Sequence, residues 1–247
     1  MLDFKKEIEK IDGLITEHEG TFLYNAARKA RPGNVIVEIG SWKGKSTVCL
    51  ARGSQDGNGV KVFAVDPHQG SSEHKHIFGK VDTFQEFIGN IKERGIDYLV
   101  SPIRDTSENA ARSFNQKIDF LFIDGAHEKE MVELDFRLWF PKVAEGGLIA
   151  FHDSWDYWGP TIASAEVLFG SPNVKNPRTI DSITVFEKTE RNNFINRLEN
   201  IIFIFIRPIL GVIDMLKYGK GIIRYLPTKE YLLDYIKKPF NKNDHEK

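Results

Sequence analysis

The segment from Val35 to Ala51 constrains the fold more than any other part of this chain. It opens with an apolar run, Val35 to Ile39, of the kind that forms a strand buried on both faces. Gly40 and Gly44 follow, and the residues from Lys45 onward can wind as a helix. A strand, a glycine turn and a helix form the first half of a βαβ unit, in which ligands bind at the carboxyl end of the strand. The glycine turn is therefore the expected ligand site.

The spacing of this turn separates three kinds of ligand. A phosphate-binding P-loop needs four residues between its first glycine and the Gly-Lys-Ser/Thr sequence. Only three residues separate Gly40 from Gly44-Lys45-Ser46, so this pattern is missed by one residue. The dinucleotide pattern G-x-G-x-x-G fails as well, because Ser41-Trp42 stand where its second glycine is needed. The pattern Glu-x-Gly-x-x-x-Gly, from Glu38 to Gly44, is present, and an ordinary strand-to-helix turn is its structural alternative.

The composition is that of a soluble globular protein whose charge is unevenly distributed. The 247 residues suffice for one sizeable domain with appendages, and the net charge is −1. Residues 194–247 hold ten Lys or Arg and six Asp or Glu, a charge of +4, which leaves −5 for residues 1–193. This distribution argues against nucleic acid as the main ligand. The single cysteine, Cys49, excludes an internal disulfide, and the absence of a signal-peptide pattern leads us to expect a cytoplasmic location.

Strands and helices alternate along the chain, which predicts a mostly parallel sheet. After the first strand we expect parallel strands over residues 60–65, 98–103, 118–123 and 148–151, and an antiparallel edge strand over 182–187. Helices are expected over residues 3–15, 21–30, 45–51, 83–94, 108–114, 129–140 and 161–169. We predict three regions: an N-terminal helical cap (1–32), a ligand-binding domain (33–190) and an apolar, basic helical tail (191–247). The polar segment 70–79 is expected to be a solvated loop or a lid.

Polar residues follow several of the predicted strands. Asp66 ends the second strand, roughly 20 residues after the glycine turn, where a carboxylate can grip two ribose hydroxyls. An Asp-Pro turn is the alternative role for this residue. The fourth strand ends in Asp124-Gly125-Ala126-His127 and the fifth in His152-Asp153. Because adjacent parallel strands end at the same edge of a sheet, we expect these side chains to converge.

Taken together, these motifs resemble one branch of the class I S-adenosylmethionine-dependent methyltransferases. That branch includes sugar and antibiotic O-methyltransferases, rhamnosyl O-methyltransferases and the so-called cephalosporin hydroxylases. The resemblance extends from Glu19 to about Lys188. It implies a Rossmann-like α/β fold with a seven-stranded, mostly parallel sheet, an antiparallel last strand, N-terminal helices and a C-terminal helical tail. It also implies S-adenosylmethionine as the cofactor, contacted by Glu38, Gly40, Ser41, Trp42, Gly44, Ser46, Asp66, Asp105, Ser107 and Asp124.

Methyl transfer to a hydroxyl requires a group that removes the hydroxyl proton. Our candidates for the catalytic residues are His127, as general base, with Asp124 and His152. A divalent ion such as Mg²⁺ can also acidify a hydroxyl, and its candidate ligands are Asp124, His152 and Asp153. In related metal-dependent methyltransferases an acidic or amide residue occupies the position of His152, so the need for an ion is open. Without an ion, His127 or His152 would take the proton.

The predicted function is therefore an S-adenosylmethionine-dependent O-methyltransferase that acts on a hydroxyl of a sugar, glycan or similar small molecule. Two alternatives remain open at this point. One is a catalytically inactive cofactor-binding module that scaffolds a membrane-associated glycan pathway. The other is a hydroxylase on the same fold. A nicotinamide oxidoreductase is disfavoured because the dinucleotide glycines are missing.

The predicted tail contains the most apolar run of the chain, residues 201–206, which Arg207-Pro208 interrupts. This run is far shorter than the about 20 residues needed to span a bilayer. Apolar side chains with nearby cations over residues 194–226 are typical of a segment that lies at a membrane surface. Three interpretations follow: peripheral contact with the inner face of the membrane, a homo-oligomer contact, or a helix that covers the sheet.

Overall fold

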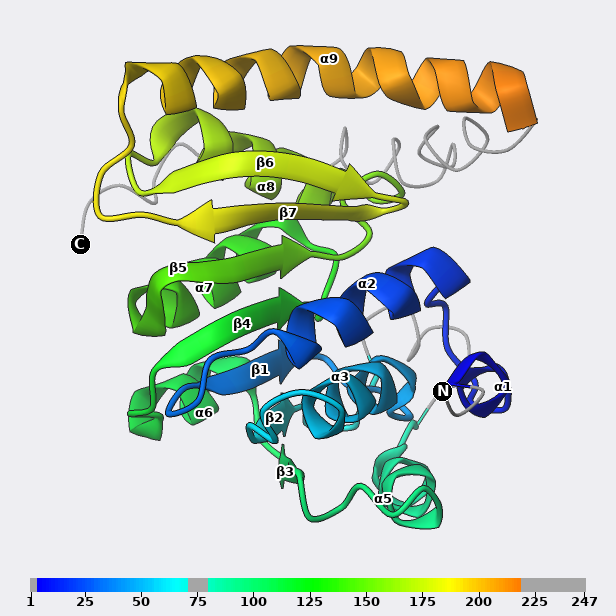
Figure 1. Ribbon diagram of the computed structural model, residues 1–247. Helices are drawn as coiled ribbons and strands as arrows, with labels where there is room; N and C mark the ends of the chain where they lie inside the picture. Colours follow the sequence, from blue (N-terminus) through cyan, green and yellow to red (C-terminus); the bar gives the residue numbers. More distant parts are fainter. Residues whose placement is uncertain (1–3, 71–79, 219–247) are drawn as a thin grey trace. The chain divides into compact units, whose positions relative to one another are not determined.

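A computed structural model describes residues 4–70 and 80–218 of the chain. Its centre is a seven-stranded sheet in the order β3-β2-β1-β4-β5-β7-β6 (Figure 1). All neighbouring strands pair in parallel except at β7, which is antiparallel to both β5 and β6. The predicted fold class is confirmed. The strands are β1 Val35–Ile39, β2 Val62–Val65, β3 Val100–Ile103, β4 Ile118–Ile123, β5 Val143–Phe151, β6 Val174–Ile180 and β7 Ile183–Lys188.

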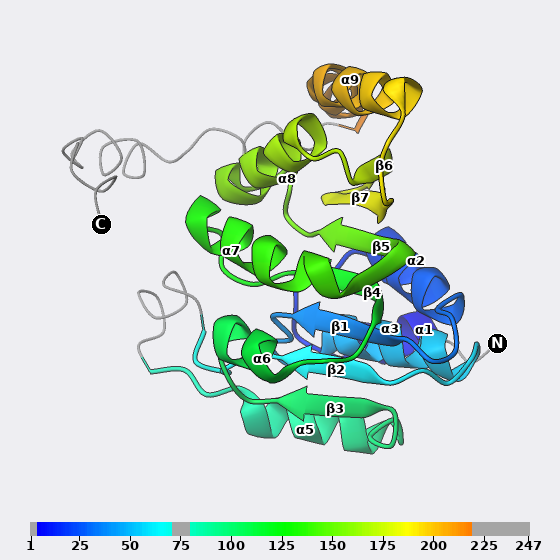
Figure 2. The same cartoon turned by 90° about the vertical axis from the view of Figure 1, so that its left-hand side faces the viewer.

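Helices cover both faces of the sheet (Figures 1 and 2). One face carries α1 (Phe4–Glu9), α2 (Glu17–Arg28), α3 (Lys45–Gln55) and α5 (Phe84–Glu93), which share one hydrophobic cluster with the sheet. The other face carries α6 (Ser107–Ser113), α7 (Lys129–Trp139) and α8 (Trp158–Gly170), which share a second cluster. A short 3₁₀ helix, Phe140–Lys142, connects α7 to β5. The sheet is therefore buried on both sides, as its apolar strands require.

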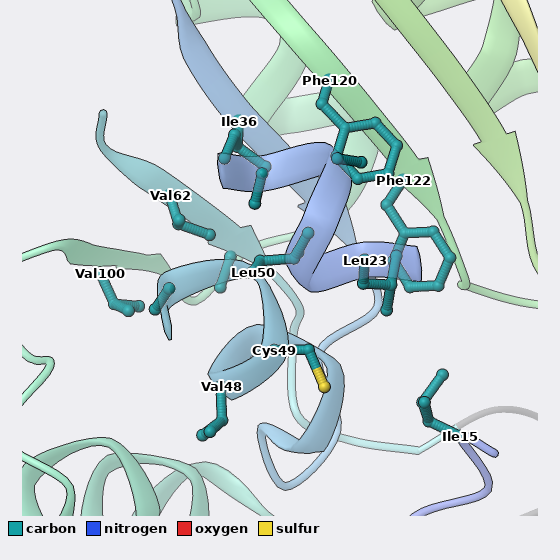
Figure 3. Packing of buried hydrophobic residues seen from close by; sticks show 14 of the residues in the cluster. Ile15, Leu23, Ile36, Val48, Cys49, Leu50, Val62, Val100, Phe120 and Phe122 are labelled. Carbon is teal, nitrogen blue, oxygen red and sulfur yellow. The ribbon is translucent and has the colours of Figure 1, made fainter. Parts of the chain in front are cut away.

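The two clusters follow from the alternation of side chains along each strand. In β4, Phe120 and Phe122 point into the first cluster, whereas Leu121 and Ile123 point into the second. Figure 3 shows Phe120 and Phe122 beside Leu23 of α2 and above the α3 residues of the same cluster. Each such side chain, when fully buried, contributes about 1.5–3 kcal/mol to folding. This packing fixes where the strands end, and the site lies at those ends.

Backbone hydrogen bonds align the carboxyl ends of four neighbouring strands. The Gly40 N–H donates to Val65 O at 2.9 Å, and the Asp124 N–H donates to Ile39 O at 2.8 Å. The His152 N–H donates to Ile123 O at 2.9 Å. Between β1 and β4 the order of the strands reverses, which is where open α/β sheets bind ligands. Residues that follow β2, β1, β4 and β5 are therefore brought to one edge.

The structure corrects several element boundaries. Residues 17–20 lie between the two helices that we expected over 3–15 and 21–30, but they form the first turn of α2, because Thr16 and Glu19 make a reciprocal capping box. Helix α1 ends at Glu9 rather than at residue 15, and β5 begins at Val143 rather than at residue 148. Strand β6 had no counterpart among the strands expected from the alternation of residues. It lies at the sheet edge, and its pairing with β7 shifts register between Lys175 and Arg178, which blurs the alternating pattern.

The N-terminal helices pack in the same layer as α3 rather than apart from the sheet. A Cβ on Gly53 of α3 would lie 2.1 Å from the carbonyl oxygen of Tyr24 in α2, so the two helix backbones touch. The chain forms two compact units, Met1–Phe205 and Ile206–Lys247. Helix α9 (Phe194–Tyr218) begins in the first unit and ends in the second, with Pro208 inside it. Within the first unit, Phe203 and Ile204 of this helix pack against the second cluster.

Two of the predicted features concern residues that the structure does not describe. The expected loop or lid at 70–79 lies outside the described residues except for Gly70, and so does the part of the tail from 219 onward. Among the residues that are described, none belongs to a helix with the length and apolar character needed to cross a membrane.

Candidate functional site

The glycine turn after β1 is shaped by close backbone contacts. Gly40 has a φ of +84°, and a Cβ at this position would lie only 2.1 Å from the carbonyl oxygen of Asp124. Gly44 has a φ of +90°, is the N-cap of α3 and donates its N–H to Ser41 O at 2.7 Å. Both positions favour glycine, because other residues are strained in this region of φ. The turn therefore places the end of β1 directly against the end of β4.

Asp66 braces this turn. Its Oδ2 accepts the backbone N–H of Ser41 at 2.9 Å and that of Trp42 at 2.8 Å. Its Oδ1 accepts the backbone N–H of His68. Trp42 and His68 have positive φ values of 46° and 58°, which non-glycine residues adopt only when their surroundings compensate the strain. Asp66, the residue predicted to bind the ribose, thus holds two strained residues in place. Its carboxylate has further lone pairs that can accept hydrogen bonds from a ligand.

Glu38 lies near the end of β1, just before the turn, and is fully buried. Its Oε2 accepts the hydroxyl of Thr47 in α3, whereas its Oε1 is buried with no hydrogen-bond partner. Burial raises the pKa of Glu38 to about 8, and hydrogen bonds from Ser46 and Thr47 only partly oppose this shift. A buried acceptor without a donor costs about 1–3 kcal/mol. This carboxyl group is therefore suited to receive a hydrogen-bond donor from a ligand.

The ends of β4 and β5 bring together the four residues expected there. His152 Nδ1 lies 2.9 Å from Asp124 Oδ1 and 3.2 Å from Asp153 Oδ2. His127 Nε2 lies 3.1 Å from Asp153 Oδ2, so Asp153 joins the two imidazole rings. Asp153 itself has a positive φ of 51°. The expected convergence of these side chains is therefore observed at one edge of the sheet.

Glu19 of α2 also belongs to this cluster, although no motif pointed to it. Its side chain is only 1% exposed, and its Oε2 lies 3.4 Å from His152 Nε2. Burial alone would raise the pKa of Glu19, but the hydrogen bond from His152 lowers it below its usual value. The Thr16-x-x-Glu19 capping pattern predicts the local position of this residue, but no sequence signal relates it to His152.

The pKa shifts in the cluster follow from burial and from opposite charges. Burial alone would lower the pKa of His152, but Asp124, Asp153 and Glu19 hold it well above the usual value for histidine. Burial alone would raise the pKa of Asp153, but hydrogen bonds from His127 and His152 keep it well below its usual value. Burial raises the pKa of Asp124, and His152 opposes that shift. The carboxylates around the buried His152 therefore favour its protonated form.

His127 lies on a loop rather than on a strand, and contacts with neighbouring residues fix its position. Its ring stacks on Tyr157, with 3.8 Å between the ring centroids, and its Nε2 faces Asp153. The loop that carries it is pressed against α8, since a Cβ on Gly159 would lie 1.9 Å from His127 O. A small pocket between β4, β5 and α8 is lined by Asp124, His127 and His152, among others. His127 and Asp124 are thus available at a concave surface.

The remaining predicted cofactor residues lie in different surroundings. Ser46 is buried at the start of α3 and hydrogen bonds to Glu38. Asp105 Oδ1 accepts the Thr106 N–H at 2.7 Å and Asn109 Nδ2 at 3.0 Å, which organises the first turn of α6. Ser107 Oγ accepts the indole N–H of Trp139 in α7 at 2.8 Å. Ser107 therefore serves the packing of α6 on α7, and the pocket-lining residues do not include it.

The predicted metal ligands, Asp124, His152 and Asp153, place one atom each within 4.8 Å of one another. This donor set does not fit Mg²⁺, which prefers oxygen ligands and retained waters. Both ring nitrogens of His152 already face carboxylate oxygens, and an imidazole must lose a proton before it can bind a metal. The carboxylates that face both nitrogens favour a positive charge on His152, in the place where an ion would bring one.

Comparison with known proteins places this site in a family context. Residues 37–154 match the family model described as "Methyltransferase domain". An uncharacterized protein of Acanthamoeba polyphaga mimivirus, R132, is 31% identical over 133 residues, which cover 52% of this chain and 56% of that protein. Another relative, the uncharacterized protein y4gI of Sinorhizobium fredii, is 29% identical over 157 residues, 58% of this chain and 16% of that protein. The chain thus spans about half the length of the first relative and far less of the second.

Solved structures show the fold. The methyltransferase PaMTH1 of Podospora anserina, solved with bound S-adenosylhomocysteine, superposes with a TM-score of 0.58 at 15% identity, over 76% of this chain and 86% of that one. The O-methyltransferase TomG of Streptomyces achromogenes, solved with S-adenosylmethionine, gives 0.54 at 17% identity, over 75% and 86%. Residues 37–154 are therefore similar to this methyltransferase-domain family, and the chain has the Rossmann-like fold of the class I S-adenosylmethionine-dependent methyltransferases.

Proposed function

We propose that this protein is an S-adenosylmethionine-dependent O-methyltransferase that works without a metal ion. One observation carries the proposal: Gly40 packs on the backbone of Asp124, so the glycine turn adjoins the pocket that holds Asp124 and His127. A cofactor turn and a proton-accepting group are the two parts that O-methylation needs, and they must be adjacent.

Residues at the end of β1 suit the proposed cofactor. Glu38 has a buried oxygen without a hydrogen-bond partner, and a positively charged amino group placed beside it would favour its ionised, accepting form. Gly40 and Gly44 allow the backbone to approach a ligand closely, and Asp66 is positioned to add a ribose contact to its bracing of the turn. When bound, S-adenosylmethionine supplies a methyl group on a sulfonium centre, which a hydroxyl oxygen can attack in line.

His127 is the proposed general base. With Nε2 hydrogen bonded to Asp153, the ring would take the acceptor's proton on Nδ1, which is buried in this structure and has to become accessible when the acceptor binds. Asp153 fixes the tautomer and stabilises the imidazolium that forms, as the carboxylate does in a Ser-His-Asp triad. The acceptor hydroxyl would lose its proton to His127 as its oxygen bonds to the methyl carbon and the carbon–sulfur bond breaks, which leaves a neutral thioether. We propose His127 rather than His152 for this role, because both nitrogens of His152 face carboxylates.

The acceptor that we propose is a sugar or glycan hydroxyl, or that of a similar small molecule. Support comes from the polar groups at the pocket, since Asp124 accepts hydrogen bonds and His127 stands within the same pocket. Adjacent hydroxyls of a sugar present two donors to such a pair. The cytoplasmic location expected from the sequence stays a prediction.

The proposal is tested by separating cofactor binding from turnover. We expect His127→Ala to bind the cofactor normally in calorimetry and to lose about 10²–10⁴-fold in methyl-transfer rate. Asp66→Ala should weaken cofactor binding, whereas Asp66→Asn keeps an acceptor for the turn and should weaken it less. His18→Ala, which changes an exposed histidine of α2, is the matched control.

Mass spectrometry of cell-surface glycans with and without the protein would seek a difference of one methyl group in the acceptor.

Two outcomes would redirect the proposal. Normal cofactor binding by Asp66→Ala would show that the ribose role is wrong. Cofactor binding without turnover on any hydroxyl acceptor would favour the alternative of an inactive module that scaffolds a glycan pathway.

We also propose that the start of α9 contacts an anionic membrane surface. Phe194, Leu198, Ile202 and Phe205 follow one another at helical spacing and are exposed. Residues 194–247 carry a charge of +4, which complements anionic lipid. A contact between two copies of the chain is the alternative partner for this face.

A further inference from the structure

The surroundings of His152 are unusual because each ring nitrogen meets a carboxylate. Nδ1 lies 2.9 Å from Asp124 Oδ1 and 3.2 Å from Asp153 Oδ2, and Nε2 lies 3.4 Å from Glu19 Oε2. These are the charged groups that face the ring, from the end of β4, from the segment after β5 and from α2; His127 lies one contact further away, on Asp153. The ring is 4% exposed, so water screens these contacts little.

Hydrogen-bond chemistry fixes the state of this ring. An ionised carboxylate only accepts hydrogen bonds, and a neutral imidazole has a single N–H to donate. Two nitrogens that both face carboxylates are satisfied when each carries a proton, which makes the ring a cation. A buried charge is tolerated when it is paired and hydrogen bonded, and here carboxylates surround it.

Glu19 is itself anchored by groups from distant parts of the chain. Its Oε1 accepts the Ser182 N–H at 2.9 Å and the Ser182 hydroxyl at 2.6 Å, in the turn between β6 and β7. Its Oε2 accepts the Thr16 N–H at 2.9 Å. Glu19 and Ser182 both lie outside the matched segment 37–154. Because three polar groups fix this carboxylate, it can hold His152 without moving.

We propose that Glu19 is a positioning residue that fixes His152 between Asp124 and Asp153, where the imidazolium takes the place of a divalent cation. The cluster then needs no ion, because His152 neutralises the strand-end carboxylates and leaves Asp153 to orient His127. Only the catalytic consequence of this inference rests on the proposed methyl transfer. The arrangement of charge itself can be measured without cofactor or acceptor.

Metal titration of the full chain tests whether an ion is replaced. We expect the wild-type protein to bind neither Mg²⁺ nor Mn²⁺ in calorimetry at concentrations up to about 1 mM, since its donor set includes a cation. His152→Asp converts the cluster to converging carboxylates, and it should bind Mn²⁺ at least about tenfold more tightly than the wild type. Binding of either ion to the wild type in the micromolar range, lost in Asp124→Asn, would overturn the proposal.

Nitrogen-15 NMR of the histidine rings tests Glu19 directly. We expect both nitrogens of His152 to carry protons in the wild type well above pH 7. In Glu19→Gln the ring should lose its second proton at a pH lower by about one unit or more, because a neutral amide replaces a carboxylate. Gln remains compatible with the capping box, so α2 should persist.

Thr16→Ala is the matched control for a purely structural role. It removes the other half of the capping box and keeps the carboxylate at His152. We expect this variant to be less stable and to leave the His152 ring signals at the wild-type position. Unchanged His152 signals in Glu19→Gln, or an equal shift in Thr16→Ala, would contradict the role of Glu19. Neither readout involves methyl transfer, so a failure here leaves the proposed activity standing.

Discussion

At the scale of single residues, position 40 is where the structure most strictly requires glycine. Its φ of +84° and the 2.1 Å approach of a would-be Cβ to Asp124 O combine strain with a steric clash. We expect Gly40→Ala to lower the free energy of unfolding by about 3 kcal/mol and to weaken cofactor binding more than tenfold. Urea unfolding and calorimetry measure these two effects.

Gly33 offers a matched control for this substitution. It has the same φ of +84°, but a Cβ there would meet nothing within 4 Å. Gly33→Ala therefore carries the strain alone, about 1–2 kcal/mol, and should leave cofactor binding unchanged. Equal losses in the two variants would mean that the contact between β1 and β4 has no role of its own.

Glu38 makes stability depend on pH in a predictable direction. Burial raises its pKa to about 8 from an ordinary value of 4.5, so between these values the folded protein binds a proton that the unfolded chain lacks. The contribution of Glu38 to the free energy of unfolding therefore falls as pH rises through this window, by about 1.4 kcal/mol per pH unit. Urea unfolding of the wild type and Glu38→Gln at pH 5, 6, 7 and 8 should show this difference in slope. Parallel profiles would show that Glu38 ionises normally in the folded state.

Residue positions at strand ends could be predicted, but their hydrogen-bond partners could not. Asp124, His127, His152 and Asp153 follow apolar runs whose strands are adjacent, so their proximity follows from topology. Glu19 reaches the cluster because α2 packs beside α3 in the tertiary structure, and its local sequence shows only a helix cap. The family resemblance led us to expect that Ser107 contacts the cofactor, but it could not reveal that the Ser107 hydroxyl accepts from Trp139, a partner 32 residues away.

At the scale of elements, the start of α8 positions the loop of the proposed base. Gly159 lets the helix approach His127 O so closely that a Cβ would lie 1.9 Å from it. We expect Gly159→Ala to displace this loop and reduce the methyl-transfer rate about 100-fold, while cofactor binding persists because the glycine turn is untouched. Gly170→Ala, at the other end of α8, meets nothing within 4 Å and should keep full activity. A normal rate in Gly159→Ala would argue against His127 as the base.

The elements that the sequence predicted well are those buried on both faces. Strands β1 and β4 are apolar runs with one acidic residue each, Glu38 and Asp119, and both were expected with the bounds that the structure shows. Strand β6 was not expected, since Asn176 with its positive φ and Pro177 interrupt its alternation. At the start of α2, charged residues suggested a break, although acidic residues in a first turn are favourable there.

At the scale of the whole molecule, the site draws on segments that lie on both sides of the matched methyltransferase domain. Glu19 comes from before residue 37, and Tyr157 and Gly159 come from after residue 154. The central segment thus supplies the glycine turn and the strand-end carboxylates, while the flanking segments fix both histidines.

The charge of the molecule is also divided along the chain, and this leads to a test of the start of α9. Residues 1–193 carry −5 and residues 194–247 carry +4, so an anionic membrane should attract the tail and repel the remainder. We expect the full chain to float with vesicles that contain anionic lipid, and to remain unbound with neutral vesicles or in high salt.

Phe194→Ser and Phe205→Ser together should abolish flotation, because these rings are 80% and 71% exposed on α9. Phe169→Ser removes a ring that is 61% exposed on α8 and should float normally. If all variants stay unbound while the wild type sediments as a dimer that Phe194→Ser and Phe205→Ser dissociate, the partner of this face is a second copy of the chain.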